Sequence, residues 1–455
     1  LFFEYRSLLQ LLSVIEPIFI FSYLLYIVFP FLSIVFSNFF DKLQNLWYFT
    51  WPKHRKVPMK KEKILKLNDI KARNMLALLE LLLQHDSLSR IELAHKMNCD
   101  NTTVTRAVRD LLERGLLISS GKTELRHGRP REQLTLNPDG KYVIGIALDP
   151  NGIIGTVTDL RGRVKVREQA FFQMQRTRSL FLETLENITR RLIRFADDKL
   201  AGVGVSTFGA GMESGTHLND IANFPELNNL NLRDFFVAKF QIEPEFSDMM
   251  ICRMYDELIR HPESRQGNTL MVSAGSGIGM AMAVDGKIIH GKERHGGELG
   301  HNICEPDGIP CACGRKGCLE TRCSTDAILL EAQKAFRDPE LTFPALAELY
   351  RNGDRKAEQL LDIPLRFLSV ALANQINNLS PGYLILTGEL TELGETFFHA
   401  LEERIRTLLF PFASQGLKLI CRGADEECGA VGAALLVTAK LMSDLDAFEK
   451  ACPHL

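Results

Sequence analysis

Three cysteines and one histidine have the spacing of a metal site. Cys311, Cys313 and Cys318 lie within eight residues, and nine residues separate His301 from the first of them. Three thiolates and one imidazole complete tetrahedral coordination of Zn²⁺ and leave no open position, which is typical of a structural site. Because ten cysteines in 455 residues do not make a disulfide scaffold, we predict a structural zinc ion in a reducing compartment.

The glycines of this passage fit the same interpretation. Gly314 and Gly317 let the backbone turn tightly around an ion, since glycine adopts conformations that other residues avoid. Cys304 and Cys323 are interpreted as packing residues. The alternative is a cluster of reduced cysteines that holds no metal.

Residues 101–112 carry a second group of residues suited to chemistry. Apolar residues recur there at helical spacing and should form one buried stripe: Val104, Val108, Leu111 and Leu112. The exposed sides keep hydroxyl and basic residues: Thr102, Thr103, Thr105, Arg106 and Arg109. Hydroxyls at the start of a helix meet DNA phosphates, and arginine reaches guanine edges in the major groove. The pattern predicts a recognition helix.

The surrounding segments complete a winged helix-turn-helix. A helix is expected over Ile70–Leu83, and Ser89 with Glu92 forms a capping box for the next helix. Gly115 ends the recognition helix, and a hairpin with strands at 116–118 and 133–136 follows. Its loop is basic, with Lys122, Arg126, His127, Arg129 and Arg131. The alternative is a three-helix bundle whose arginines are only solvated.

Charge is distributed unevenly along the chain. The net charge is −2, yet residues 60–136 hold 15 Lys and Arg against 10 Asp and Glu. A basic segment on an otherwise acidic chain favours a local polyanion partner, and ordinary surface charge is the alternative.

The first 52 residues form an apolar segment. Residues 17–40 contain no charged residue and are long enough to span a bilayer, and a basic cluster from Lys53 to Lys63 follows. Either this is a single anchor with the remainder in the cytoplasm, or the reading frame is over-extended or truncated before Met59. We otherwise expect a cytoplasmic protein, with a membrane as partner only if residues 17–40 are a genuine span.

From residue 141 the pattern is α/β. Strands are expected at Tyr142–Leu148, Ile153–Val157 and Gly202–Val205, with a helix at Phe181–Arg194. We therefore divide the chain into 1–52, a DNA-binding domain at 60–140 and an α/β domain at 141–455. Gly275–Gly279 follows a further strand, and its amides could cradle an anion or form an ordinary turn.

The passages Glu-Leu-Gly-His at 298–301 and Cys-x-Cys-Gly-x-x-Gly-Cys-x-Glu at 311–320 resemble the signature of the ROK family (repressor, open reading frame, kinase). The likeness runs from about Lys66 to the C-terminal region and is to the regulator branch, which includes xylose and N-acetylglucosamine repressors. It implies a two-lobed actin-like, ribonuclease-H-like domain after the winged helix. It also implies sugar-binding residues: Asn223, Asp248, Glu298, His301 and Glu320. Ser247 replaces the usual asparagine.

One departure from the family decides the predicted activity. Active kinases of the family carry Asp-x-Gly-Gly-Thr in the first hairpin, where this chain has Ala147-Leu148-Asp149-Pro150-Asn151. Both glycines are lost, Ala147 replaces the acid, and Pro150 has no N–H to donate. The expectation is a sugar-responsive repressor that binds operator DNA as a homodimer or higher oligomer. The alternative is an ATP-dependent sugar kinase with an added DNA-binding head, in which Asp248 acts as general base.

Overall fold

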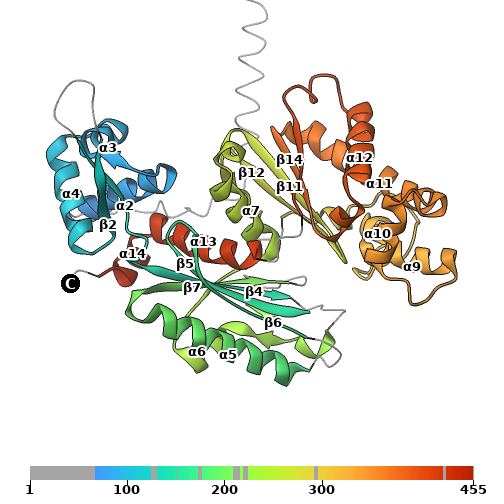
Figure 1. Ribbon diagram of the computed structural model, residues 1–455, viewed down its shortest axis with the longest axis horizontal. Coiled ribbons are helices and arrows are strands. Elements are labelled where there is room, and N and C mark those ends of the chain that lie inside the picture. Colours follow the sequence, from blue (N-terminus) through green and yellow to red (C-terminus); the bar gives the residue numbers. More distant parts are fainter. Residues whose placement is uncertain are drawn as a thin grey trace, which may run out of the picture. The chain divides into compact units, whose positions relative to one another are not determined.

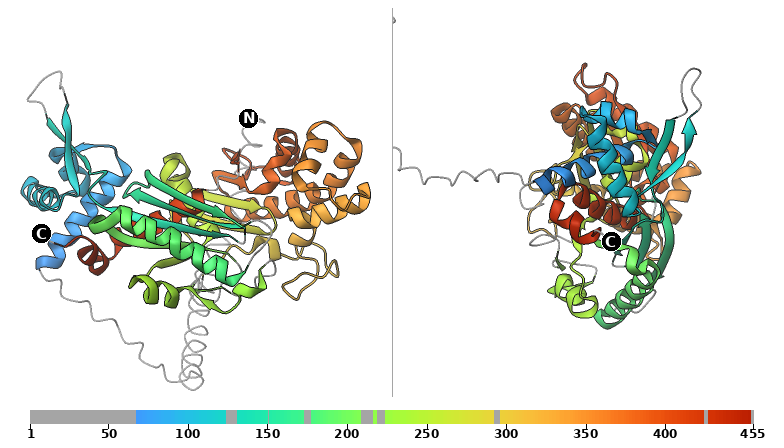
Figure 2. Two further views of the ribbon diagram at one scale, coloured as in Figure 1. Left: turned by 60° about the horizontal axis from the view of Figure 1, so that its bottom comes forward. Right: turned by 90° about the vertical axis from the view of Figure 1, so that its left-hand side faces the viewer.

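A module of three helices and a β-hairpin opens the described part of the chain. The computed structural model describes residues 67–123, 131–149, 151–172, 177–208, 216–218, 224–291, 296–423 and 427–453. The module consists of α2 (Leu67–Gln84), β1 (Leu88–Ser89), α3 (Arg90–Met97), α4 (Asn101–Glu113), β2 (Leu117–Thr123) and β3 (Arg131–Leu136). Its strands pair in the order β1-β3-β2, so the hairpin is a wing beside the helices (Figure 1 and Figure 2).

Local capping explains where the helices of this module begin. Ser89 and Glu92 form the expected capping box at α3. Asp100 caps α4, because its carboxylate accepts the Thr103 amide at 2.9 Å. Val104, Val108 and Leu111 are buried as expected, and Leu112 is half-buried.

Two five-stranded mixed sheets with the same strand order follow. The first has the order β10-β7-β4-β5-β6, and the second has the order β13-β12-β11-β14-β15. In each sheet the first three strands in sequence are antiparallel, and the fourth and fifth are added in parallel on the other side. This repeated topology confirms the expected two-lobed α/β fold (Figure 1).

The strands of the first sheet are β4 (Tyr142–Asp149), β5 (Gly152–Asp159), β6 (Val164–Phe171), β7 (Leu200–Thr207) and β10 (Glu245–Asp248). Those of the second are β11 (Asn268–Ala274), β12 (Ile278–Val284), β13 (Lys287–Ile288), β14 (Tyr383–Thr387) and β15 (Lys418–Cys421). β4 and β5 are inner strands covered on both faces, so they are almost continuously buried, whereas the edge strand β6 is largely exposed. A small pair, β8 (His217–Leu218) and β9 (Leu230–Asn231), lies outside the sheets.

Helices cover the sheets and connect the lobes. The first lobe contains α5 (Arg178–Ala196), α6 (Leu232–Phe240), α13 (Cys428–Ser443) and α14 (Leu445–Ala451). The second contains α8 (Glu320–Cys323), α9 (Thr325–Phe336), α10 (Phe343–Arg351), α11 (Arg355–Leu379) and α12 (Glu395–Leu408). α7 (Met249–Arg260) packs against α13 with one face and against the second sheet with another.

α13 approaches the first sheet closely because two strand residues lack a side chain. A Cβ on Gly145 would lie 1.9 Å from the Ala430 carbonyl oxygen, and one on Gly204 would lie 1.9 Å from that of Ala433. Helix and strand backbones are therefore in direct contact, which fixes α13 on β4 and β7.

Gly204→Ala is expected to destabilise the protein by about 1–3 kcal/mol, because the new methyl group must push α13 off the sheet. Gly423→Ala is the matched control, since a Cβ there meets nothing within 4 Å. Urea unfolding measures both. Equal midpoints for the two variants would mean that α13 does not pack so closely.

Within the described residues, no single helix is long and apolar enough to cross a membrane. α13 and α14 pass that test only together, across a bend of 111°, and most residues of α13 are buried inside the protein. The predicted span at residues 17–40 lies outside the described residues.

Candidate metal centre and nucleic-acid interface

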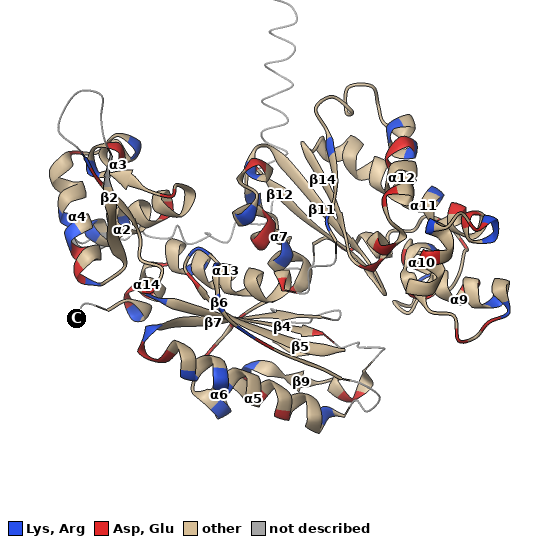
Figure 3. Cartoon of the chain, in the orientation of Figure 1, with Lys and Arg blue, Asp and Glu red and all other residues tan. Residues whose placement is uncertain are grey.

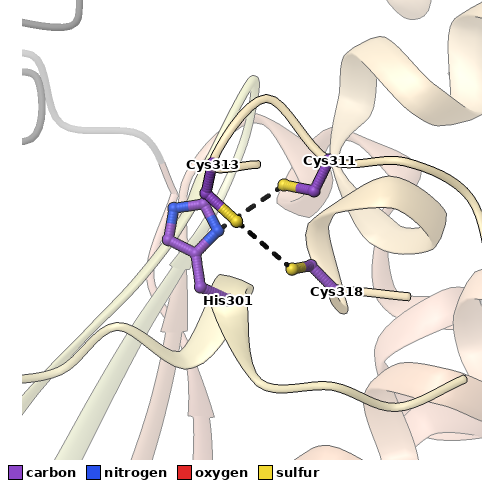
Figure 4. Close-up of side chains that lie close together, drawn as sticks. All are labelled: His301, Cys311, Cys313 and Cys318. Atoms are coloured by element: carbon purple, nitrogen blue, oxygen red, sulfur yellow. Dashed lines mark hydrogen bonds between the residues drawn. The ribbon is translucent and has the colours of Figure 1, made fainter. Parts of the chain in front are cut away.

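Four side chains expected to bind a metal come together in space. The ligand atoms of His301, Cys311, Cys313 and Cys318 all lie within 4.8 Å of one another (Figure 4). Cys311 Sγ is 3.7 Å from His301 Nδ1, and Cys313 Sγ is 3.6 Å from Cys318 Sγ. An ion about 2.3 Å from each sulfur at tetrahedral angles would separate two sulfurs by about 3.8 Å. The cluster has the dimensions that a tetrahedral metal ion requires.

Glycine makes the tight path of this loop possible. Gly314 and Gly317 have φ of 85° and 74°, as the sequence predicted. A Cβ on Gly317 would lie 1.8 Å from the Glu305 carbonyl oxygen, and one on Gly297 would lie 1.9 Å from that of Met280. The ion pair of Arg322 with Glu305, at 2.7 Å, joins the loop to α8. The backbone of this loop therefore brings the four ligand side chains together.

The thiols of Cys313 and Cys318 have pKa values shifted in opposite directions. Hydrogen bonds from the backbone amide and the side chain of Arg315 lower the pKa of Cys313 to about 6. Burial, reinforced by the neighbouring thiols, raises the pKa of Cys318 to about 12. A bound divalent cation would favour the deprotonated form of all three cysteines, because its charge stabilises the three thiolates together.

Two glutamates flank the metal loop. Glu298 is exposed and precedes the short 3₁₀ turn that carries His301. Glu320 is half-buried at the start of α8, and its carboxylate accepts the Ile278 amide at 3.1 Å. A Cβ on Gly300 would lie 3.1 Å from the same carboxylate. Glu320 therefore connects the metal loop to the Gly275–Gly279 turn.

The expected anion loop is partly occupied by internal hydrogen bonds. The Gly275 amide donates to the Gly277 carbonyl at 2.9 Å, and the Ile278 amide is bonded to Glu320. The amides of Gly275 and Ile278 therefore already donate hydrogen bonds within the protein, and the acceptor for Ile278 is the Glu320 carboxylate. Of the two interpretations left open by the sequence, an ordinary turn fits this geometry better.

Asp248 ends β10 in the first lobe and caps α7. Its Oδ1 accepts the Ile251 amide at 2.9 Å, and burial raises the pKa of its carboxyl group. Among the described residues, no hydrogen bond or ion pair joins Asp248 to Glu298 or Glu320. Asn223 lies outside the described residues.

Asp149 of the first hairpin interacts electrostatically with Glu389 of the second lobe. Burial raises the pKa of Asp149, and the negative charge of Glu389 adds to this effect. The Asn151 amide donates to the Asp149 carboxylate at 2.8 Å. Pro150 lies outside the described residues. The hairpin therefore presents a carboxylate where the kinase motif has glycine, a feature that sequence alone did not connect to Glu389.

A cavity of about 740 Å³ lies beside the metal loop, between it and α11. His301, Arg315, Arg366 and Asn374 are among its lining residues, whereas Asp248, Glu298 and Glu320 are not. The sequence gave no signal for this cavity, since it depends on how α11 packs against the loop.

Four of the five residues predicted to read DNA on α4 are exposed, and Thr103 is half-buried. The Thr103 hydroxyl donates to Asp100 at 2.7 Å, and the Thr105 hydroxyl donates to the Asn101 carbonyl at 2.7 Å. Arg109 lies 3.8 Å from both Asp110 and Glu113. Arg106 is exposed and forms no ion pair within the described residues, so it is the most available cation of this helix. Figure 3 shows basic residues, in blue, on α4.

The basic wing is described only in part. Lys122 belongs to β2, but its side chain lies outside the described part, as do Arg126 and Arg129. Arg131, at the start of β3, is exposed.

Comparison with known proteins identifies the larger part of the chain. A model of the ROK family matches residues 143–440. The chain belongs to the ROK family. A model of the MarR family matches residues 73–124, which contain the helix-turn-helix of this ROK protein. The predicted resemblance is therefore confirmed.

Repressors are similar to this ROK chain along nearly their whole length. A xylose repressor of Bacillus spizizenii is 21% identical over 373 residues, covering 81% of this chain and 95% of the relative. An N-acetylglucosamine repressor of Escherichia coli O6:H1 is 25% identical over 394 residues, covering 83% and 95%. A glucokinase of Thermotoga maritima, 25% identical, covers only 57% of this chain and 86% of its own length. The regulators therefore account for more of this chain.

A solved structure shares the fold. It is a ROK family transcriptional regulator described as a homologue of the Escherichia coli MLC protein, with a TM-score of 0.71 and 20% identity. The match covers 84% of this chain and 99% of that one. The winged module and the two lobes of this chain therefore have counterparts in that regulator structure.

Proposed function

We propose that this ROK protein is a sugar-responsive transcriptional repressor. A DNA-reading module and a ROK domain share one chain, and repressors match both parts; this observation carries the proposal. Residues 60–140 form its DNA-binding domain and residues 141–455 its sugar-binding domain. It acts as a homodimer or higher oligomer, because one winged helix contacts too few bases for genomic specificity.

The metal in this proposal is zinc, held by His301, Cys311, Cys313 and Cys318. The donor set of one imidazole and three thiolates supports it, since soft ligands favour Zn²⁺ over Mg²⁺ or Ca²⁺. The four protein ligands leave no position for water or substrate. Zinc therefore fixes the loop between Glu298 and Glu320 and supplies no reaction chemistry.

The effector is a small sugar or sugar derivative bound by Asn223, Asp248, Glu298, His301 and Glu320. Carboxylates accept hydrogen bonds from adjacent sugar hydroxyls, and Asp248 belongs to the other lobe from the last three residues. A sugar that contacts both sides favours one arrangement of the lobes over another. Such a preference is what a ligand needs to alter DNA binding.

Phosphoryl transfer is not part of the proposed function. A triphosphate approaching the first hairpin would meet the carboxylates of Asp149 and Glu389 instead of glycine amides. Like charges repel strongly where burial excludes water, so nucleotide binding is disfavoured. Ala147 offers no oxygen to a magnesium ion. A coupled assay with ATP, magnesium and a panel of hexoses should give no turnover, and clear turnover would establish the kinase instead.

The decisive experiment measures binding of the full-length protein to DNA from upstream of its own gene. Affinity should fall steeply with salt, because phosphate contacts release counterions. Xylose, N-acetylglucosamine and other sugars are then added at fixed salt. Absence of salt-dependent DNA binding would contradict the proposed binding to operator DNA. DNA binding that no sugar changes would contradict the proposed response to sugar.

Asp248→Asn isolates the role of the carboxylate in sugar binding. Asparagine is an equally good helix cap, so α7 should still begin at Met249. A hydrogen bond to a charged group contributes roughly 1.5–3 kcal/mol, so sugar affinity should fall about 10- to 100-fold. Calorimetric titration measures this effect, and unchanged affinity would remove Asp248 from the pocket.

A further inference from the structure

The winged module and the first lobe share one hydrophobic core. The module contributes Leu79 and Leu111, β4 contributes Val143, and the last two helices contribute Leu441 and Phe448. A continuous apolar core resists separation, because opening it would expose buried surface to water. The second lobe has a core of its own, built entirely from residues between Leu270 and Leu417.

Arg114 fastens the end of the recognition helix to the C-terminal helix. It is the C-cap of α4, and its side chain is only 2% exposed. Its guanidinium donates to the Cys452 carbonyl, reaches the Glu449 carboxylate at 3.2 and 3.3 Å, and lies 5.7 Å from the centre of the Phe448 ring. A buried charge with this many partners fixes orientation, because moving it would leave the charge unpaired.

Arg161 makes a second contact between the first lobe and the winged module. Here the arginine belongs to the lobe and its partners belong to the module. It comes from the turn between β5 and β6 of the first lobe, and its side chain is 12% exposed. One guanidinium nitrogen, Nη2, donates to the carbonyl oxygens of His85 at 3.0 Å and Asp86 at 3.1 Å, just after α2. The same nitrogen lies 3.4 Å from the Thr135 hydroxyl on β3. Arg161 therefore contacts both the first helix and the wing.

α13 connects these contacts to the first hairpin. At its start, a Cβ on Gly429 would lie 3.2 Å from the Ala147 Cβ of the first hairpin. At its end, Leu441 belongs to the core shared with the winged module. Sixteen helical residues span about 24 Å without a break.

We propose that Arg114 and Arg161 are positioning residues that lock the winged module onto the first lobe, so that the module and lobe turn as one rigid body when the effector alters the angle between the lobes. The mechanism rests on the proposed function. In this mechanism the recognition helix is already held against the first lobe in the free protein. A module joined by a flexible linker, or one that folds only on DNA, would not be held in this way.

Hydrogen exchange of the free full-length protein tests the lock without DNA or sugar. Amides of α2 and α4 should exchange at rates similar to those of β4 and α13, as one cooperative unit. Arg161→Gln should accelerate exchange in α2 and β3 and leave α11 unchanged. Arg163→Gln, an exposed arginine in the same turn, should change neither. If α2 and α4 of the unmodified protein exchange far faster than α13, the lock does not exist.

A second measurement separates positioning from mere stability. The ratio of DNA affinities with and without a saturating sugar is the coupling, typically about 5- to 150-fold in allosteric proteins. Arg161→Gln and Glu449→Ala should reduce this ratio toward 1 while sugar affinity stays unchanged. Glu449 is 39% exposed, and Arg114 keeps its hydrogen bond to the Cys452 carbonyl when Glu449 is removed, so the variant should still fold, which thermal unfolding checks. Glu403→Ala on α12 is its control.

The outcomes distinguish the two proposals. Weaker DNA binding with an unchanged ratio would show that the arginines only stabilise the module, which overturns the rigid-body mechanism. No DNA binding by the unmodified protein would refute the repressor, while hydrogen exchange would still decide whether the lock exists.

Discussion

Replacing Cys318 by serine is expected to abolish stoichiometric zinc and the response to sugar together. Even residues outside the ligand sphere change metal affinity by roughly 10- to 100-fold, so losing one of four ligands should weaken binding at least that much. Without the ion, the loop that links Glu298 to Glu320 loses its anchor. Metal analysis of the purified protein and thermal unfolding with and without sugar measure both effects.

Cys304→Ser is the matched control for this variant. Cys304 lies in the same passage, outside the group of four, and its thiol donates to the Gly317 carbonyl at 3.5 Å. It should retain zinc and the sugar response. DNA binding without sugar should survive in Cys318→Ser, because the winged module shares its core with the first lobe and the metal loop packs on the core of the second lobe. A Cys318→Ser protein that keeps one zinc per chain would contradict the assignment of ligands.

Arg106→Ala is expected to weaken binding to upstream DNA about 5- to 150-fold, corresponding to roughly 1–3 kcal/mol for one arginine that reads a base. Arg106 is exposed on α4 and free of ion pairs within the described residues, whereas Arg109 lies near Asp110 and Glu113. Arg109→Ala should therefore cost less. Fluorescence anisotropy with a labelled DNA fragment measures the series.

Two controls accompany Arg106→Ala: the salt dependence of its DNA binding, and a variant that removes a positive charge far from α4. A base contact should change specificity between DNA sequences, whereas a phosphate contact should weaken all sequences alike and lower the salt dependence. Lys334→Ala removes an exposed positive charge on α9 of the second lobe and should leave DNA binding unchanged. If Arg106→Ala binds as tightly as the unmodified protein, α4 does not read the groove through this residue.

Short-range patterns allowed the sequence to predict the metal loop and the winged module. The ligands of the metal cluster are 17 residues apart at most, so their types and the glycines between them nearly define the loop. The capping box at Ser89 and the apolar stripe of α4 act within a few residues. Interactions of this range depend little on the rest of the fold.

Other features of the site involve partners that no local pattern connects. Glu320 accepts a hydrogen bond from the Ile278 amide across 42 residues. Burial raises the pKa of Asp149, and the charge of Glu389 in the other lobe adds to this effect. Arg114 caps the end of α4 and is buried against Cys452, 338 residues away. Such pairings follow from how the sheets and helices pack, which periodicity does not encode.

The sequence by itself determined a cluster of four potential metal ligands and a helix-turn-helix, and it predicted a first hairpin unsuited to phosphate. The tertiary structure alone decided how they are connected, with the winged module attached to the first lobe through α13, α14, the buried Arg114 and the half-buried Arg161. The physical reason is range. Ligand spacing and helix caps are properties of neighbouring residues, whereas a shared core exists only once distant segments exclude water together.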